Sequence, residues 1–133
     1  MKKTILALLV IISVSTYSSN VIFKSDKATI LAGSWVWQKS TGGQNGSYTS
    51  TPKTLGSTKK LVFTTDGKVI TYKNNVEIRN SNYQLTKGIS VFDNLEHDLI
   101  TFEGITYVIE KLDSRNLVIV NNFPDGYSST FKK

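Results

Sequence analysis

Residues 60–73 read Lys-Leu-Val-Phe-Thr-Thr-Asp-Gly-Lys-Val-Ile-Thr-Tyr-Lys, two runs of β-forming residues on either side of an Asp-Gly pair. Branched and aromatic side chains favour extended backbone because they fit the pleated surface of a sheet. An Asp-Gly pair between two such runs favours a hairpin turn of type I′, in which both turn residues have positive φ. The segment therefore predicts two antiparallel strands, 60–65 and 68–73, joined by a tight turn at Asp66-Gly67.

The same alternation of short β-rich runs and turn residues continues along the chain. Asn74-Asn75 supplies a second tight turn directly after this hairpin, and no stretch after residue 20 repeats apolar residues at helical spacing. The expected strands are 34–40, 60–65, 68–73, 76–85, 98–102, 106–111, 116–120 and 127–131. Their short connections favour antiparallel neighbours. The sequence thus predicts an all-β fold, an eight-stranded antiparallel up-and-down β-barrel.

The first twenty residues have the three-part order of a secretory signal peptide. Lys2-Lys3 precedes an apolar run at 5–14, and small polar residues follow at 15–20. An apolar run of about ten residues is too short for a membrane core that needs about twenty, so no permanent anchor is expected. We therefore expect a signal peptide at 1–20, a linker at 21–30 with a helical turn near 25–31, and a barrel domain at 31–133. The protein is expected to be exported, either periplasmic or secreted.

Gly33-Ser34-Trp35 opens the first expected strand with a Gly-x-Trp pattern. Together with the hairpin at 61–67, a strand around Tyr83 and Asp125-Gly126-Tyr127 before the last strand, it resembles the lipocalin-like domains of small exported bacterial proteins, which are calycin-type barrels. The resemblance covers about 31–133, and it implies a cup for a small, often apolar molecule and no catalytic residues. Lipocalins commonly place an arginine of the last strand across the tryptophan of this pattern. Here the cations near that point are Lys132 and Lys133.

Strand alternation places Trp35, Trp37 and Lys39 on one face, which the two tryptophans predict to be the inner face. The corresponding inner set of the other strands is Leu61, Phe63, Ile70, Tyr72, Tyr83, Leu85, Tyr107, Ile109, Leu117, Ile119, Ser129 and Phe131. Two interpretations remain open: these side chains fill the barrel, or they line a lumen where tyrosine hydroxyls meet a ligand. For the second, the candidate ligand contacts are Trp37, Lys39, Phe63, Tyr72, Tyr83 and Tyr107, whereas Gly33 and Trp35 are structural.

The sequence lacks the residue patterns that metal binding, nucleophilic catalysis and nucleic-acid binding usually need. The chain has no cysteine, and its single histidine, His97, lies in a polar run without the spacing of a zinc or calcium site, so we expect no metal and no cofactor. No Gly-x-Ser-x-Gly elbow supports a catalytic triad, and the protein is not expected to be an enzyme. The net charge is +6, but the lysines are scattered rather than gathered in a stripe, so nucleic-acid binding is not expected.

Two functions from different classes follow from this sequence. The first is a carrier that holds a small apolar or aromatic molecule in the barrel. The second is a protein-binding or inhibitor module that meets another exported protein through the long polar loop at 41–58, since loops on a rigid scaffold often carry binding surfaces. An open lumen would favour the first, and a packed interior would favour the second.

Overall fold

The computed structural model describes residues 26–133, so the expected signal peptide at 1–20 and half of the expected linker lie outside the described residues. Within 26–133 the strands are β1 (Gly33–Gly42), β2 (Tyr48–Ser50), β3 (Lys59–Phe63), β4 (Lys68–Lys73), β5 (Val76–Ile89), β6 (Glu96–Phe102), β7 (Ile105–Leu112), β8 (Asn116–Asn121) and β9 (Ser128–Lys132). The short helices η1 (Gln44–Gly46) and α2 (Pro52–Leu55) flank β2. In this part of the chain no helix has the length and apolar character needed to span a membrane.

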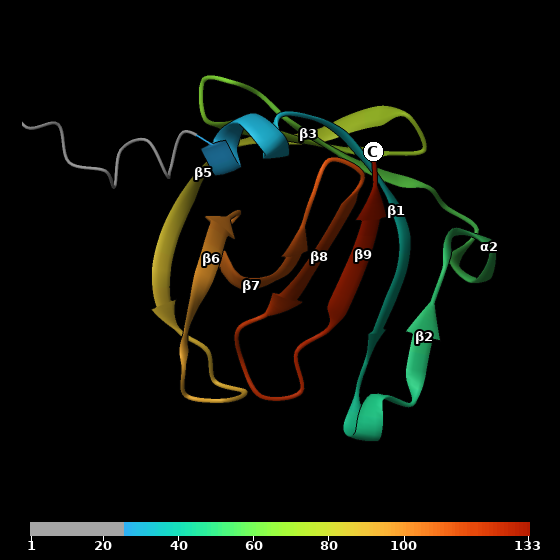
Figure 1. The fold of residues 1–133 in the computed structure, drawn as a ribbon. Coiled ribbons are helices and arrows are strands. Elements are labelled where there is room, and N and C mark those ends of the chain that lie inside the picture. Colours follow the sequence, from blue (N-terminus) through green and yellow to red (C-terminus); the bar gives the residue numbers. More distant parts are fainter. Residues whose placement is uncertain (1–25) are drawn as a thin grey trace, which may run out of the picture.

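Eight of the strands close into an antiparallel barrel (Figure 1). From β3 to β9 each strand pairs with the next in the sequence, and β1 lies between β3 and β9. Trp37 is paired with Phe131, and Thr41 with Ser128, so the first strand pairs with the last and the barrel is closed, as the sequence predicts. The three-residue strand β2 pairs with the end of β1 and lies outside the ring of eight.

The turn between β3 and β4 differs from the predicted one. Phe63 pairs with Val69, and the Thr64 amide donates to the Lys68 carbonyl, so three residues rather than two form the loop. Of these, Gly67 alone has positive φ, at 87°. A three-residue hairpin loop with glycine in the left-handed position is the next commonest solution after the two-residue turns.

This longer loop moves the register by one residue, and a one-residue shift exchanges the two faces of a strand. Leu61 and Phe63 now lie opposite Thr71 and Val69, and Val69 is fully buried. The prediction that Ile70 and Tyr72 face inward is therefore wrong. The second turn is as predicted, because Asn74 and Asn75 both have positive φ and join strands that pair directly on either side of them.

A β-bulge in β1 corrects a second predicted orientation. Trp37 pairs with Phe131 and Lys39 with Thr130, so Gln38 is an extra residue without a partner on β9. A bulge interrupts the alternation of side chains along a strand. Ser40, rather than Lys39, therefore lies on the same side as Trp37, and the exposed Lys39 is not an inner residue.

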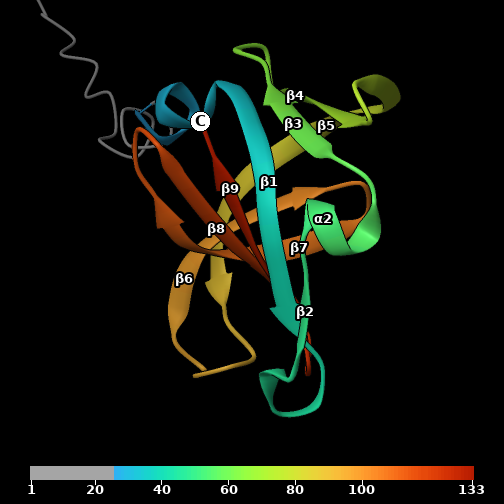
Figure 2. The ribbon, with the colours of Figure 1, turned by 90° about the vertical axis from the view of Figure 1, so that its right-hand side faces the viewer.

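Residues 26–31 form the helical turn expected near this position, and it covers the end of the barrel where β1 begins and β9 ends (Figure 2). Leu31 is fully buried in the core, and Lys27 forms an ion pair with Asp98 of β6. The last residues of the expected linker therefore pack as part of the barrel.

Candidate functional site

Four of the six candidate ligand contacts belong to the interior of the barrel. Trp37 and Phe63 are buried in the core, and Tyr83 and Tyr107 pack against it while remaining partly exposed. Lys39 and Tyr72 do not join them, and Tyr72 lies on the outer face below the ammonium group of Lys60, 4.6 Å from its ring centroid. The structure thus brings together four aromatic candidates from four strands, β1, β3, β5 and β7, and excludes Lys39 and Tyr72.

The interior aromatic rings contact one another. Phe63 meets Tyr83 edge-on at 5.3 Å between ring centroids, and it meets Phe102 in the same way at 6.1 Å. Tyr107 stacks on Phe102 at 4.9 Å. Such offset and edge-on pairs add about 0.5–1.5 kcal/mol each beyond the burial of their area. These rings stabilise the barrel as each other's packing partners.

The indole N–H of Trp37 is also satisfied within the protein. It donates to Ser40 Oγ at 2.9 Å, and the Ser40 and Ser129 hydroxyl oxygens are 2.7 Å apart. The side chain is 2% exposed, and the Lys59 ammonium lies 5.0 Å from its ring centroid. The indole N–H and the ring face of Trp37 therefore both have partners within the protein, Ser40 and Lys59.

Trp35 occupies the structural position expected for the Gly-x-Trp pattern. Its indole N–H donates to the Leu31 carbonyl at 2.7 Å, and Lys133 Nζ lies 5.1 Å from its ring centroid. The same ammonium donates to the carbonyls of Ile30 and Ala32. Lys133 therefore covers the ring where the resemblance expects an arginine, and it also ties the helical segment to the barrel.

Gly33 leaves room for this lysine. Its φ is 120°, and a Cβ atom at this position would lie 2.7 Å from Lys133 Cε. Any other residue would strain the backbone and displace the lysine side chain.

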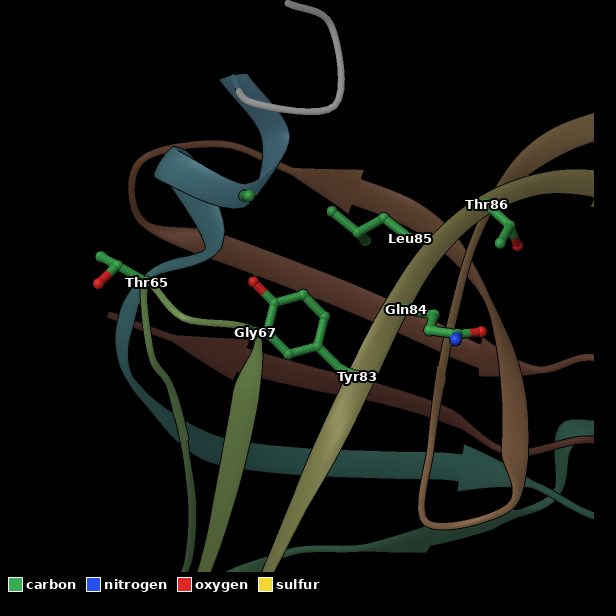
Figure 3. Close-up of a pocket in the computed structure, with 7 residues that line it drawn as sticks. Thr65, Gly67, Tyr83, Gln84, Leu85 and Thr86 are labelled. Atoms are coloured by element: carbon green, nitrogen blue, oxygen red, sulfur yellow. The ribbon is translucent and has the colours of Figure 1, made fainter. Parts of the chain in front are cut away.

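A pocket of about 450 Å³ lies between the helical segment 26–31, the β3–β4 turn and β5. We call it the rim pocket; it is lined by Ala28, Thr65, Gly67, Tyr83, Gln84, Leu85 and Thr86. Figure 3 shows Tyr83 and Leu85 projecting from one side of β5 toward the helical segment, and Gln84 and Thr86 from the other. The Tyr83 ring and the Leu85 side chain therefore form an apolar floor that faces the helical segment, and the side chains of Gln84 and Thr86 point away from it.

Tyr83 connects the rim pocket to the core. Its ring contacts Phe63 on one side and lines the pocket on the other. Burial raises the pKa of the Tyr83 phenol above its ordinary value, and the nearby carboxylate of Asp66 adds to the increase. The hydroxyl therefore stays protonated at neutral pH and is able to donate a hydrogen bond to a bound molecule. Burial raises the pKa of Tyr107 as well, with a contribution from Glu103.

Sequence reasoning identified Tyr83 and placed Leu85 on the inner face, but it missed the other lining residues of the rim pocket. Ala28 comes from the expected linker, and Thr65 and Gly67 come from a turn. No local signal marks these residues, because the pocket exists only once the helical segment lies over β5.

His97 binds a carboxylate of its own chain. Its Nε2 atom lies 2.6 Å from Asp93 Oδ2, and Asp93 also accepts from the Leu95 amide. The Leu95 amide, followed by the His97 side chain, lowers the pKa of Asp93. Across residues 26–133, no three His, Asp or Glu side chains gather closely enough to hold a metal ion.

The long polar loop at 41–58 is partly regular. It contains β2 and α2, and the Thr51 side chain caps α2 by accepting from the Thr54 amide. Tyr48 and Leu55 are exposed along this segment. Its expected role in binding a protein remains a prediction.

Comparison with known proteins adds no relative to this description. No family model, no curated protein and no solved structure matches the chain.

Proposed function

We propose that the protein is a non-enzymatic binding protein that holds a small apolar or aromatic molecule in the rim pocket. The observation that carries the proposal is the pocket itself, since its volume of about 450 Å³ falls within the usual range for small-molecule sites. Leu85 and the Tyr83 ring supply apolar contact, and the Tyr83 hydroxyl supplies a hydrogen-bond donor.

The location of the site follows from the packing of the interior. Trp37 and Phe63 are almost completely buried by their own neighbours, whereas Tyr83 reaches from this cluster to the rim pocket. This packed centre argues against a ligand inside the barrel, where Trp37 and Phe63 were expected to contact it. The proposal of a carrier therefore depends on the rim pocket alone, where a ligand would contact the edge of the aromatic cluster at Tyr83.

A lipocalin-like, up-and-down barrel is part of the same proposal. Closure of eight antiparallel strands, a helical turn over one end and a cation over Trp35 support it. Fold likeness alone would not assign a ligand, so the pocket residues carry the functional part.

Ala28→Trp is expected to abolish most binding of an apolar fluorescent probe, because the indole would occupy the space above Tyr83 and Leu85. The measurement is a titration of the full chain with 8-anilinonaphthalene-1-sulfonate. Leu55→Trp, which introduces the same indole on exposed α2, is the matched control and should bind as the wild type does. Native mass spectrometry of protein from its own host should show a retained small molecule that Ala28→Trp loses. Unchanged probe binding by Ala28→Trp would refute the rim pocket as the site.

We also propose that the protein is exported and that its leader is removed. Amino-terminal sequencing of material recovered outside the cytoplasm should begin within a few residues of Asn20, as expected from the short apolar run after Lys2-Lys3. Recovery of Met1 from that material would contradict the proposal.

A further inference from the structure

One end of the barrel exposes a group of large apolar side chains. The β1–β2, β5–β6 and β8–β9 connections lie together at this end, below the barrel in both Figures 1 and 2. We call the group the apolar end; it consists of Tyr48, Ile89, Val91, Phe92, Leu95, Phe123 and Tyr127, each 40–62% exposed. Large apolar side chains that gather at one exposed end of a protein often mark an interaction site.

The β5–β6 loop is held in a conformation that points its apolar residues outward. The buried Ser90 forms its centre: its amide donates to the Leu95 carbonyl at 2.9 Å, and its carbonyl accepts from the Asn94 amide at 3.0 Å. The Phe92 amide donates to Ser90 Oγ at 3.1 Å. These hydrogen bonds fix the backbone of the loop, and in this conformation the side chains of Phe92 and Leu95 are exposed.

Contacts between loops make the apolar end one surface. The Asn122 side chain accepts from the Val91 amide at 2.9 Å and donates to the Ile89 carbonyl at 3.0 Å. Tyr127 meets Tyr48 edge-on at 6.1 Å between ring centroids. The three connections are therefore linked in a row, from the β5–β6 loop through the β8–β9 loop to β2.

The charge of this end is opposite to that of the chain. The chain has 16 Lys and Arg residues and a net charge of +6, yet none of these cations lies in segments 42–48, 88–97 or 121–128. The ionised groups there are the carboxylates of Asp93, Glu96 and Asp125, with His97 beside Asp93. Lys87, the cation next to the β5–β6 loop, forms an ion pair with Asp98 at 3.8 Å.

We propose that the apolar end docks a partner protein whose own apolar residues are surrounded by lysine or arginine. Protein interfaces commonly combine an apolar centre with a polar rim, and charge complementarity at the rim selects the partner. An anionic bilayer fits less well, because it attracts surfaces that place Lys and Arg around the inserted residues. This proposal uses residues separate from the rim pocket.

The test uses two synthetic amphipathic helices that share a leucine face and differ in the polar face, which is lysine in one and glutamate in the other. Fluorescence anisotropy with the full chain at low salt should show the lysine peptide binding about tenfold or more tightly than the glutamate peptide. Phe92→Ser with Leu95→Ser should weaken the lysine peptide about tenfold. Val76→Ser with Ile78→Ser, on exposed positions of β5 away from these loops, is the matched control and should leave it unchanged.

Neutralising the acidic residues beside the apolar end tests the charge argument separately. Glu96→Gln with Asp125→Asn should remove most of the preference for the lysine peptide, and asparagine tolerates the positive φ of residue 125. Ala28→Trp, which blocks the rim pocket, should bind the peptide as the wild type does.

Three results would overturn the proposal. The first is equal affinity for the two peptides, or an affinity for the lysine peptide that Phe92→Ser with Leu95→Ser leaves unchanged. The second is Phe92-dependent binding to vesicles of phosphatidylcholine and phosphatidylglycerol, which would make the apolar end a membrane-contacting surface. The third is concentration-dependent self-association in sedimentation equilibrium that Phe92→Ser abolishes, which would assign it to a second copy of this chain.

Discussion

Trp35→Ala is expected to lower the free energy of unfolding by about 3–5 kcal/mol, the usual cost of removing a large aromatic side chain from a packed core. Trp35 is completely buried, and it is one of the largest side chains in the core. The substitution also leaves the Leu31 carbonyl without its indole donor and removes the ring beneath Lys133. The expected loss is therefore a cavity combined with release of the helical segment.

Urea denaturation followed by far-ultraviolet circular dichroism measures this loss without depending on tryptophan fluorescence. Val36→Ala is the matched control, because Val36 is the next residue on the exposed face of β1 and should change stability by about 0.5 kcal/mol or less. Lys133→Ala should lower the free energy of unfolding by less than Trp35→Ala does. It should still make the helical segment more sensitive to proteolysis, because Lys133 ties that segment to the barrel. A Trp35→Ala midpoint within error of Val36→Ala would show that the ring is not a core element.

Phe63→Ala is expected to cost a similar amount, about 3–5 kcal/mol, and also to weaken probe binding in the rim pocket. Phe63 is 1% exposed and contacts both Tyr83 and Phe102 edge-on. Its removal leaves Tyr83 without the ring that holds it from the core side. The Tyr83 side chain should then move into the cavity, so the floor of the pocket would be lost together with stability.

Phe63→Leu separates the two effects, since it keeps most of the volume and removes the ring pairs. It should retain more stability than Phe63→Ala. Comparing probe affinity in both variants at a temperature where each is folded isolates the effect on the pocket. If Phe63→Ala binds the probe with wild-type affinity, Tyr83 is positioned by other contacts and the link between core and pocket is wrong.

The rings of the candidate site were predicted in part from strand alternation. Phe63, Tyr83 and Tyr107 do lie with the inner side chains, because apolar residues at every second position of a half-buried strand have one face to bury. The predicted orientation of Tyr72 is wrong because the preceding turn has three residues, and that of Lys39 is wrong because of the bulge at Gln38. Strand alternation predicts only which side chains within one strand share a face. It therefore could not predict that the helical segment lies over Tyr83 or that the loops of the apolar end lie together.

The count of eight expected strands implied a closed barrel, in which the first strand pairs with the last. Local residue types by themselves determined the all-β class, the Asn74-Asn75 turn and the burial of both tryptophans. These features depend on backbone preference and on apolar spacing, which are properties of short segments. Tertiary structure alone decided the three-residue loop at 65–67, the bulge at Gln38, and the placement of the helical segment and of Lys133 over Trp35. The physical reason is that closing eight strands sets one register for all of them. In that register Val69 rather than Ile70 is buried, and Ser40 rather than Lys39 lies on the side of Trp37, so the turn and the bulge take the lengths that this register requires.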